Sequence, residues 1–412
     1  MESGVDDRKG LRHLEPETML IRIIAALLIL CMAPLHAAAQ DPPRGQIVDD
    51  VRCAADPTQS YSLYLPSTYA PSRAWSLLMG FHPAARGRVI VEKYRAAAEA
   101  YGYIVAASNN SRNGEWGASA QAVAAMSADL ATRFAIDPAR VYLTGMSGGA
   151  RVAMQVALGK NRIAGVIASS AGYPDARPRA SVPFAVFGTA GTDDFNYSEM
   201  RQLERALKTP HRLVIFEGGH SLPPDPVATD AIEWMELQAI SSGLRTRDEA
   251  LVARLFEKRE QEIATAGESA KAVVLLRALA ADFKGLRDVS AATTRAEAMA
   301  KQKDVKAALA RERDDADAET RLLVQIATLE AGLRSEEQAT ESLGQLRDLL
   351  ARLWKQATST ADSLERSRAR RMLRSVTVGA SERVQNAAYL KLLQQYRLPG
   401  TAAGRGAPAG SL

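Results

Sequence analysis

The sequence predicts an α/β region with a doubly wound, mostly parallel sheet, followed by an all-helical region. Between residues 45 and 242, short runs rich in β-branched and aromatic residues alternate with amphipathic stretches, as in a parallel sheet covered by helices. After residue 245 the texture changes, since no proline occurs between Pro226 and Pro399 and apolar residues recur at helical spacing. We therefore expect an α/β domain over 45–242 and an all-α domain over 245–398.

The predicted strands are short and nearly continuous apolar runs, which is expected where both faces of a sheet are buried. They are 61–66, 75–81, 103–108, 140–145, 163–169, 182–188 and 212–218. Between the third and fourth strands, a helix is predicted over 119–135, with Ala122, Met126 and Leu130 on its apolar face.

The second half is expected to form six or seven helices of about 15–20 residues, packed as antiparallel helical hairpins. Five glycines occur along this half, and most of them are expected to end a helix. They are Gly267, Gly285, Gly332, Gly344 and Gly379. A continuous coiled coil is the competing interpretation, which these glycines disfavour. Residues 399–412 are predicted to be a disordered tail.

The N-terminus has the three parts of a secretory signal peptide, predicted over 1–39. An apolar run with one cation covers 20–32, and small residues precede Gln40. The run is too short to span a bilayer comfortably, so we expect a secreted or periplasmic protein with no stable membrane insertion after cleavage. Met19 fits as the true start, because the sequence after it is a well-formed signal by itself. An uncleaved anchor is the alternative.

Composition excludes several function classes. Lys and Arg number 52 against 47 Asp and Glu, a formal charge of +5, and no cationic cluster with interleaved aromatics suggests a nucleic-acid partner. Two cysteines and five histidines leave little for a disulfide framework or a metal site. Neither a metal nor a cofactor is predicted.

The segment Gly145-Met146-Ser147-Gly148-Gly149 fits the pattern G-x-S-x-G. It follows the predicted strand 140–145 and precedes an apolar helical pattern, which is the setting of a nucleophile elbow. There the glycines permit a sharp turn, the Ser147 hydroxyl stands above the sheet, and the Gly148 N–H points toward a bound carbonyl oxygen. A glycine-rich turn without chemistry is the alternative.

A serine nucleophile needs a base and an acid to orient that base. His220 follows the last strand after Gly218 and Gly219, so a loop at the carboxyl edge of the sheet can bring its imidazole to Ser147, whereas His211 precedes that strand. The acid is expected after the strand 182–188, where Asp194 is the first choice and Asp193 the second. The remaining aspartate is expected to cap a helix near Ser198, and Asp175 is a third candidate.

The oxyanion hole needs a second backbone donor from the loop after the strand 75–81. Ala84 is the predicted donor and Ala85 the alternative, because Pro83 has no N–H.

Residues 45–240 resemble α/β-hydrolases, in particular secreted serine esterases of the polyhydroxyalkanoate-depolymerase and feruloyl-esterase type. The segments that carry this resemblance are FHPAARG (81–87), SNNSRNG (108–114), YLTGMSGGAR (142–151), GTAGTDDFNY (188–197) and GGH (218–220). It implies an acyl-enzyme hydrolase with Ser147 as nucleophile, His220 as base and Asp194 as acid. These enzymes usually have His-Gly where this chain has His82-Pro83, which puts the oxyanion donor in doubt. The helical half is not covered.

Further side chains at the carboxyl edge are candidates for the substrate pocket: His82, Asn110 and Trp116. A tryptophan packed in its loop is the alternative for Trp116. Only about 12 residues separate the strands 163–169 and 182–188, so an open site that admits a small or polymeric ester is expected.

A peptidase or acyltransferase on the same three residues remains an alternative, as does a non-catalytic interaction protein whose helical domain binds a protein partner.

Overall fold

A computed structural model describes residues 42–159, 162–175, 177 and 179–399. The predicted signal peptide, Cys31 and nearly all of the predicted tail lie outside the described residues. Within the described part of the chain, no helix is both long and apolar enough to cross a membrane.

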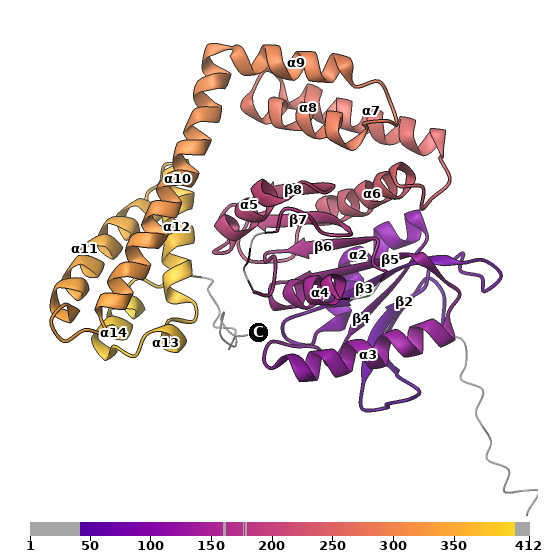
Figure 1. Cartoon of the computed structure of the whole chain (residues 1–412), viewed down its shortest axis with the longest axis horizontal. Helices are drawn as coiled ribbons and strands as arrows, with labels where there is room; N and C mark the ends of the chain where they lie inside the picture. The colour runs from indigo at the N-terminus through magenta and orange to yellow at the C-terminus, as the bar shows by residue number, and fades with distance from the viewer. Residues whose placement is uncertain (1–41, 160–161, 176, 178, 400–412) are drawn as a thin grey trace, which may run out of the picture. The chain divides into compact units, whose positions relative to one another are not determined.

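The first half is built around one eight-stranded sheet, in the order β1-β2-β4-β3-β5-β6-β7-β8 (Figure 1). Strands β3 to β8 pair in parallel, whereas β1 and β2 form an antiparallel edge. The strands are β1 (Ile47–Arg52), β2 (Ser60–Tyr64), β3 (Trp75–Phe81), β4 (Tyr103–Ser108), β5 (Ile136–Met146), β6 (Gly165–Ser169), β7 (Ala185–Gly191) and β8 (His211–Phe216). The α/β class predicted from the sequence is confirmed.

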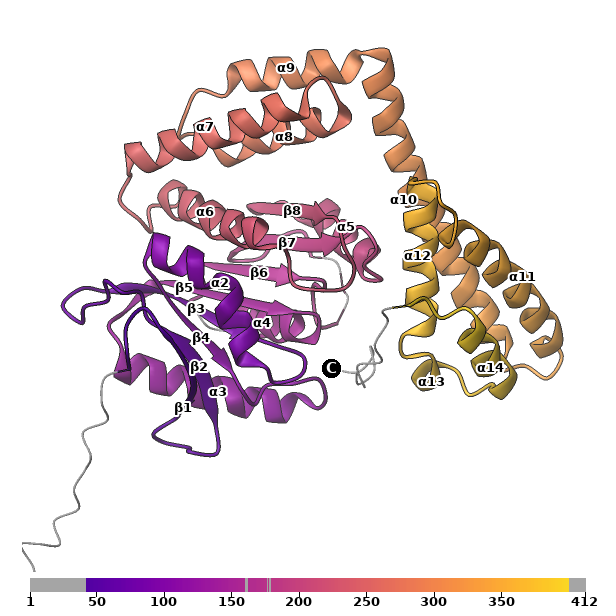
Figure 2. The ribbon, with the colours of Figure 1, turned by 180° about the vertical axis from the view of Figure 1, so that it is seen from behind.

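Helices cover both faces of this sheet because its central strands are apolar on both sides. Residues of α3 (Trp116–Arg133), α4 (Gly148–Leu158) and α5 (Tyr197–Ala206) share one core cluster with one face. Those of α2 (Gly87–Tyr101) and α6 (Asp225–Ser241) share a second cluster with the other face. Figure 1 shows α4 in front of the sheet, and the reverse view in Figure 2 brings α2 and α6 to the front.

The topology itself marks one place for a site. After β3 the chain builds β4 on one side and then returns to build β5 on the other, so the strand order reverses at β3. In open α/β sheets, ligands bind outside the carboxyl ends of the strands at such a switch point. The ends of β3 and β5, which lead into His82 and Ser147, therefore frame the expected site.

The second half consists of helices, as predicted, but their number and lengths differ from the expectation. Eight helices follow α6 within the described residues, and they range from four to 30 residues. They are α7 (Glu249–Ala266), α8 (Ala270–Asp282), α9 (Ser290–Lys301), α10 (Lys303–Gly332), α11 (Ala339–Ala357), α12 (Leu364–Thr377), α13 (Ala380–Arg383) and α14 (Ala387–Gln395). Gly344 lies inside α11 and ends no helix, whereas Gly267 follows α7 with a positive φ of 63°.

Two separate apolar cores hold these helices. The first joins the end of α6 to α7, α8, α9 and the start of α10, and the second joins the end of α10 to α11, α12 and α14. The long helix α10 thus carries the chain from one core to the other. Capping residues fix several starts, since Asp248, Ser269 and Ser363 each accept a backbone N–H from the first turn of the helix that follows.

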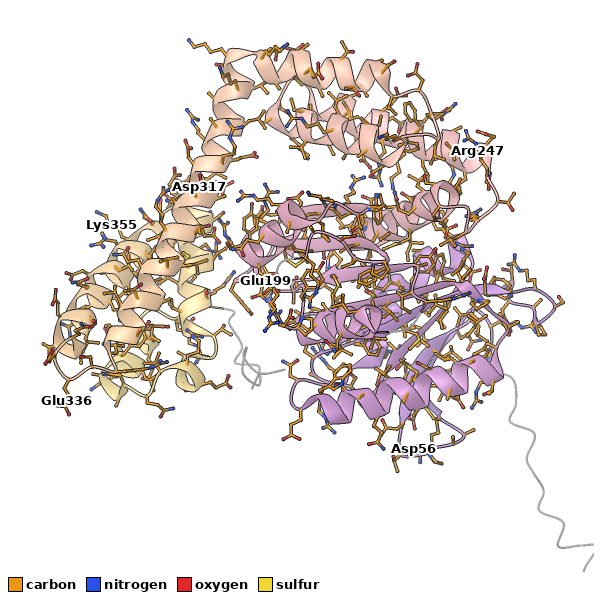
Figure 3. All side chains as sticks on the ribbon, in the orientation of Figure 1. Asp56, Glu199, Arg247, Asp317, Glu336 and Lys355 are labelled. Carbon is orange, nitrogen blue, oxygen red and sulfur yellow. The ribbon has the colours of Figure 1, made fainter. Side chains whose placement is uncertain are left out.

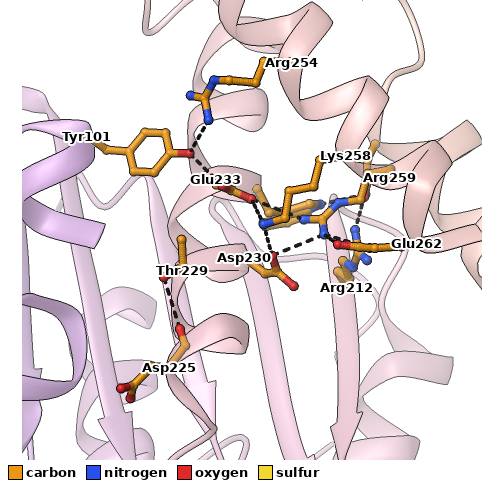
Figure 4. A network of polar contacts seen from close by, with 12 residues as sticks. Tyr101, Arg212, Asp225, Thr229, Asp230, Glu233, Arg254, Lys258, Arg259 and Glu262 are labelled. Carbon is orange, nitrogen blue, oxygen red and sulfur yellow. Dashed lines mark hydrogen bonds and ion pairs between the residues drawn. The ribbon is translucent and has the colours of Figure 1, made fainter. Parts of the chain in front are cut away.

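A polar network fastens α7 to α6 (Figure 4). The ammonium of Lys258 lies 2.7 Å from both Asp230 and Glu233, and Arg259 lies 3.3 Å from Asp230. Nearby, the indole of Trp234 donates to the buried Asp282 of α8 at 2.7 Å. These paired buried charges hold the first helices of the second half against the last helix of the sheet region.

Candidate active site

Ser147 occupies a sharp turn between β5 and α4. Its φ of 54° and ψ of −123° lie in a region that costs a non-glycine residue about 1–3 kcal/mol, and strain of this kind concentrates at functional sites. The flanking glycines are required by close contacts. A Cβ on Gly145 would lie 2.2 Å from the Gly149 oxygen, and one on Gly149 would lie 2.1 Å from the Phe81 oxygen. The G-x-S-x-G pattern therefore forms the strand-to-helix elbow that it predicts.

The backbone N–H and carbonyl of Ser147 are both hydrogen-bonded, while its side chain makes no capping bond to α4. The Ser147 N–H donates to the Ser169 oxygen at 2.8 Å, and its carbonyl accepts from Ala150 and Arg151. No side-chain bond caps α4 at this residue. The next residue, Gly148, opens the helix, and the first N–H groups of a helix have no acceptor within it. The Ser147 hydroxyl therefore lies beside the electropositive N-terminus of α4.

His220 and Asp194 are joined by a hydrogen bond. Nδ1 of His220 lies 2.7 Å from Oδ1 of Asp194, which is fully buried and also accepts the Asn196 N–H at 2.8 Å. The Phe195 ring stacks on the imidazole, with 3.9 Å between the ring centroids. This arrangement fixes the imidazole plane and leaves Nε2 as the free nitrogen.

The loops that carry these two residues are tied together at the ends of β7 and β8. The Thr192 N–H donates to the Phe216 oxygen, and the Asp193 N–H donates to the Gly218 oxygen at 2.8 Å. A Cβ on Gly191 would lie 2.4 Å from the oxygens of both Gly218 and Gly219. These backbone contacts fix the loop of Asp194 against the loop of His220.

A short turn after β6, which was not predicted to be part of the site, contacts the segments that carry Ser147, Asp194 and His220. Ser170 has a φ of 61° and is fully buried, and its hydroxyl donates to the Ser221 oxygen at 3.1 Å. Its carbonyl accepts from the Asn196 side chain at 2.7 Å, while the preceding Ser169 accepts from Ser147. The signal available in the sequence was a pair of serines at the carboxyl end of a central strand. No hydrogen bond in the described part of the chain joins Ser147 to His220, and such bonds are often long in free enzymes.

The two adjacent aspartates point in different directions. Asp194 faces His220, whereas the Asp193 carboxylate lies 2.9 Å from Nε of Arg370 and 3.5 Å from Arg374, both in α12. The expectation that the second aspartate caps α5 is wrong, because Asn196 precedes that helix and no side chain caps it. Asp175 pairs with Arg179 instead, and hydrogen bonds from that guanidinium hold the pKa of this carboxyl well below its ordinary value.

The loop after β3 places His82 against both predicted oxyanion donors. The Ala84 N–H lies 3.1 Å from Nδ1 of His82, and the Ala85 N–H donates to the His82 oxygen. An Arg86 nitrogen lies 3.2 Å from Nε2 of the same ring. Burial first, and then the charge of Arg86, lower the pKa of His82 to about 4, so the imidazole is neutral at pH 7.

A neutral imidazole has only one acceptor nitrogen, so it cannot accept from both Ala84 and Arg86. The proton position on His82 therefore decides whether the Ala84 N–H is engaged by the ring or left free for a substrate oxygen.

The remaining pocket candidates are engaged in contacts of their own. Asn110 uses its amide on the backbone of Thr58 and Ser60, at 3.1 and 2.8 Å, and Trp116 is half-buried at the start of α3 against the sheet core. Asn113 lies much nearer the elbow, since a Cβ on Gly148 would fall 1.7 Å from its Oδ1.

Arg151, four residues after Ser147, joins the start of α4 to α5 and to the segment after β6. Its guanidinium holds both oxygens of Glu199 (labelled in Figure 3), at 2.9 and 2.8 Å, and also donates to the Tyr173 oxygen. Within the described residues, no cluster of His, Cys, Asp and Glu could hold a metal ion. Cys53 is buried, which raises the pKa of its thiol to about 11 and leaves it unreactive.

No protein-family model and no curated protein matches this sequence. Solved structures with a similar sheet include a thermostable esterase, 20% identical, with a TM-score of 0.34 over 43% of this chain and 58% of that chain. Another is the s-formylglutathione hydrolase of Staphylococcus aureus, 15% identical, with a TM-score of 0.37 over 47% of this chain and 98% of that one. Esterase B from Lactobacillus rhamnosis, bound to an inhibitor, is 13% identical, with a TM-score of 0.39 over 55% of this chain and 100% of its own. One sheet architecture hosts many chemistries, so likeness of this degree carries no argument about the reaction.

Proposed function

We propose that this chain is a serine hydrolase that cleaves carboxylic esters through an acyl-enzyme intermediate. The observation that carries the proposal is the pairing of a strained Ser147 elbow with a His220 imidazole held by a buried Asp194. A serine hydroxyl is a weak nucleophile until a neighbouring base takes its proton. The chain supplies that base, and an acid that fixes its tautomer, from separate loops at the same sheet edge.

The reaction follows from these roles. Nε2 of His220 takes the Ser147 proton as Oγ attacks the ester carbonyl, and the Gly148 N–H stabilises the oxyanion that forms. The imidazolium, stabilised by Asp194, then protonates the leaving alcohol. A water activated by the same nitrogen attacks the acyl-enzyme and frees Ser147. The second oxyanion donor is the Ala84 N–H, once the proton on Nδ1 of His82 prevents the ring from accepting it.

The test is hydrolysis of p-nitrophenyl esters of increasing acyl length by the full chain. Ser147→Ala and His220→Ala are expected to lose turnover by about 10⁴-fold or more. Two matched controls lie outside the site and are expected to keep full turnover. His211→Ala changes the histidine at the start of β8. Ser127→Ala changes a serine of α3 whose hydroxyl, among the described residues, donates one hydrogen bond, to the Met79 sulfur at 3.9 Å. A wild-type chain inert toward every ester, or a Ser147→Ala variant as active as wild type, would contradict the proposal.

We also propose that the protein acts outside the cytoplasm, on the strength of the signal-like sequence before Gln40. The measurement is the N-terminal mass of the protein recovered from the periplasm or medium, with a new terminus at Gln40 as the expected result. An intact N-terminus in the cytoplasmic fraction would contradict it.

A further inference from the structure

The helix α12 touches the turn that carries the proposed acid. Arg371 donates to the backbone oxygen of Thr192 at 2.7 Å, and Arg374 donates to the backbone oxygen of Asp193 at 3.0 Å. The Asp193 carboxylate lies between Arg370 and Arg374. Three guanidinium groups from one helix therefore bind the two residues immediately before Asp194, from a part of the chain about 180 residues away.

One of these arginines, Arg371, is itself held in place by buried contacts. The Arg371 side chain is only 5% exposed, its Nε lies 2.9 Å from Glu319 of α10, and its guanidinium lies 4.1 Å from the Tyr197 ring of α5. Arg368, one turn earlier, pairs with Asp315, also of α10. Because a buried charge that loses its partner is strongly unfavourable, Arg371 is kept in place by Glu319 when it reaches Thr192.

Arg374 reaches both loops of the proposed acid–base pair. Its guanidinium lies close to Gly219, where a Cβ would be 3.3 Å from Nη1, and Gly219 directly precedes His220. The same nitrogen donates to the Asp193 oxygen. A single side chain of the helical region therefore spans the acid turn and the base loop.

We propose that the helical region is a positioning part of the active site, in which Arg370, Arg371 and Arg374 of α12 fix the turn that orients Asp194 toward His220. This inference rests on the proposed serine-hydrolase function. The physical reason is that catalysis tolerates little error in the placement of the base, and a displacement of about 1 Å can cost 10²-fold in rate. The turn between β7 and α5 is anchored to the β8 loop on one side, and α12 supplies the anchor on the other.

The test uses the full chain with Arg374→Gln, Asp193→Asn and the double variant. Each of these variants lacks the Asp193–Arg374 ion pair and keeps the buried Arg371–Glu319 pair. Arg366→Gln is the matched control, because this arginine of the same helix faces Asp362, whose side chain is 95% exposed. Two readouts are measured: kcat and KM for a p-nitrophenyl ester, and the low-field proton resonance of the His220 Nδ1–H shared with Asp194.

We expect each single variant to lower kcat about tenfold with KM unchanged, and to shift or broaden the low-field resonance. The double variant is expected to lose less than the product of the two single losses, because both substitutions remove the Asp193–Arg374 ion pair, while each also removes one further contact of its own. Arg374→Lys is expected to recover part of the loss, and Arg366→Gln to match wild type in both readouts.

Variants that keep wild-type kcat and an unchanged resonance, even with a lower melting temperature, would overturn the positioning role and reduce α12 to a stabilising attachment. The proposed function fails separately. An inert wild-type chain would contradict ester hydrolysis, while a resonance that still changes in Arg374→Gln would support the positioning contact.

Discussion

The two sides of the candidate site differ in how firmly their groups are held. On the side of the proposed acid and base, Oδ1 of Asp194 and the backbone of Thr192 and Asp193 have fixed partners in the β8 loop and in α12, although Oδ2 of Asp194 is buried with no hydrogen-bond partner among the described residues. On the proposed oxyanion side, Ala84 and Arg86 both present donors to the single acceptor nitrogen of a neutral His82. The His220 imidazole is therefore held in one geometry, whereas the second proposed oxyanion donor depends on the position of one proton on His82.

The largest expected effect separates the adjacent aspartates on the acid–base side. Asp194→Asn is expected to lower kcat by about 10⁴-fold, because an amide no longer holds the His220 tautomer that accepts the serine proton. Asp193→Asn removes only the ion pairs to α12, and a loss of about tenfold is expected. Steady-state kinetics on one ester decide this. Equal losses in the two variants would contradict the assignment of Asp194 as the acid.

A smaller effect is expected on the oxyanion side. We expect the Arg86 guanidinium to take Nε2 of His82 as its acceptor, because a guanidinium has only donors; the ring proton then lies on Nδ1 and releases the Ala84 N–H. Arg86→Met is expected to let the ring accept from Ala84, and loss of that oxyanion donor would lower kcat/KM by about 10²-fold.

The control for this variant is Arg88→Met, two residues further along, where the guanidinium pairs with Asp49 on the surface. It is expected to leave kcat/KM unchanged. If Arg86→Met is as active as wild type, the oxyanion hole does not depend on the proton of His82.

The same histidine also gives a pH dependence of stability, which is expected to leave turnover at pH 7 unchanged. The pKa of His82 is lowered to about 4 in the folded chain, against an ordinary value near 6.5, so the unfolded chain binds the proton first as pH falls. The free energy of unfolding is therefore expected to fall between about pH 6.5 and pH 4, by up to roughly 3 kcal/mol, and His82 adds no further loss below that range.

Denaturant unfolding of wild type and His82→Gln at several pH values measures this contribution. The two curves of stability against pH are expected to converge as the pH falls from 6.5 to 4. Parallel curves would show that His82 does not titrate as its burial implies.

Much of the fold could be predicted because its signals are local. The continuous apolar strands and the glycines around Ser147 follow from burial and from close backbone contacts, and both occur in the structure. The strand β1 was not predicted, since its sequence, IVDDVR, neither alternates regularly nor forms a continuous apolar run at this edge of the sheet. The predicted strand 182–188 lies further along, at Ala185–Gly191, because the register is set by pairing with β6 and β8 rather than by local pattern.

The candidate site was predictable to the extent that it follows strand ends. Ser147 directly follows β5, and Asp194 and His220 lie in the loops that follow β7 and β8, so a parallel topology gathers them at one edge. The sequence ranks Asp194 before Asp193 but contains no local signal for what the other aspartate does. In the structure Asp194 contacts His220, while Asp193 contacts arginines about 180 residues away, which no local pattern reveals. The competition around His82 was equally hidden, since it arises from the turn that brings Ala84 and Arg86 to one ring.

Covalent labelling of the full chain with a fluorophosphonate is the sharpest test of Ser147 as the nucleophile, because such reagents trap a serine activated by a neighbouring base. Mass spectrometry of the digested protein locates the adduct. We expect one adduct on Ser147, formed in wild type and lost in His220→Ala with the chain still folded. Absence of an adduct on Ser147 in a wild-type chain that hydrolyses esters, or equal labelling in His220→Ala, would contradict it.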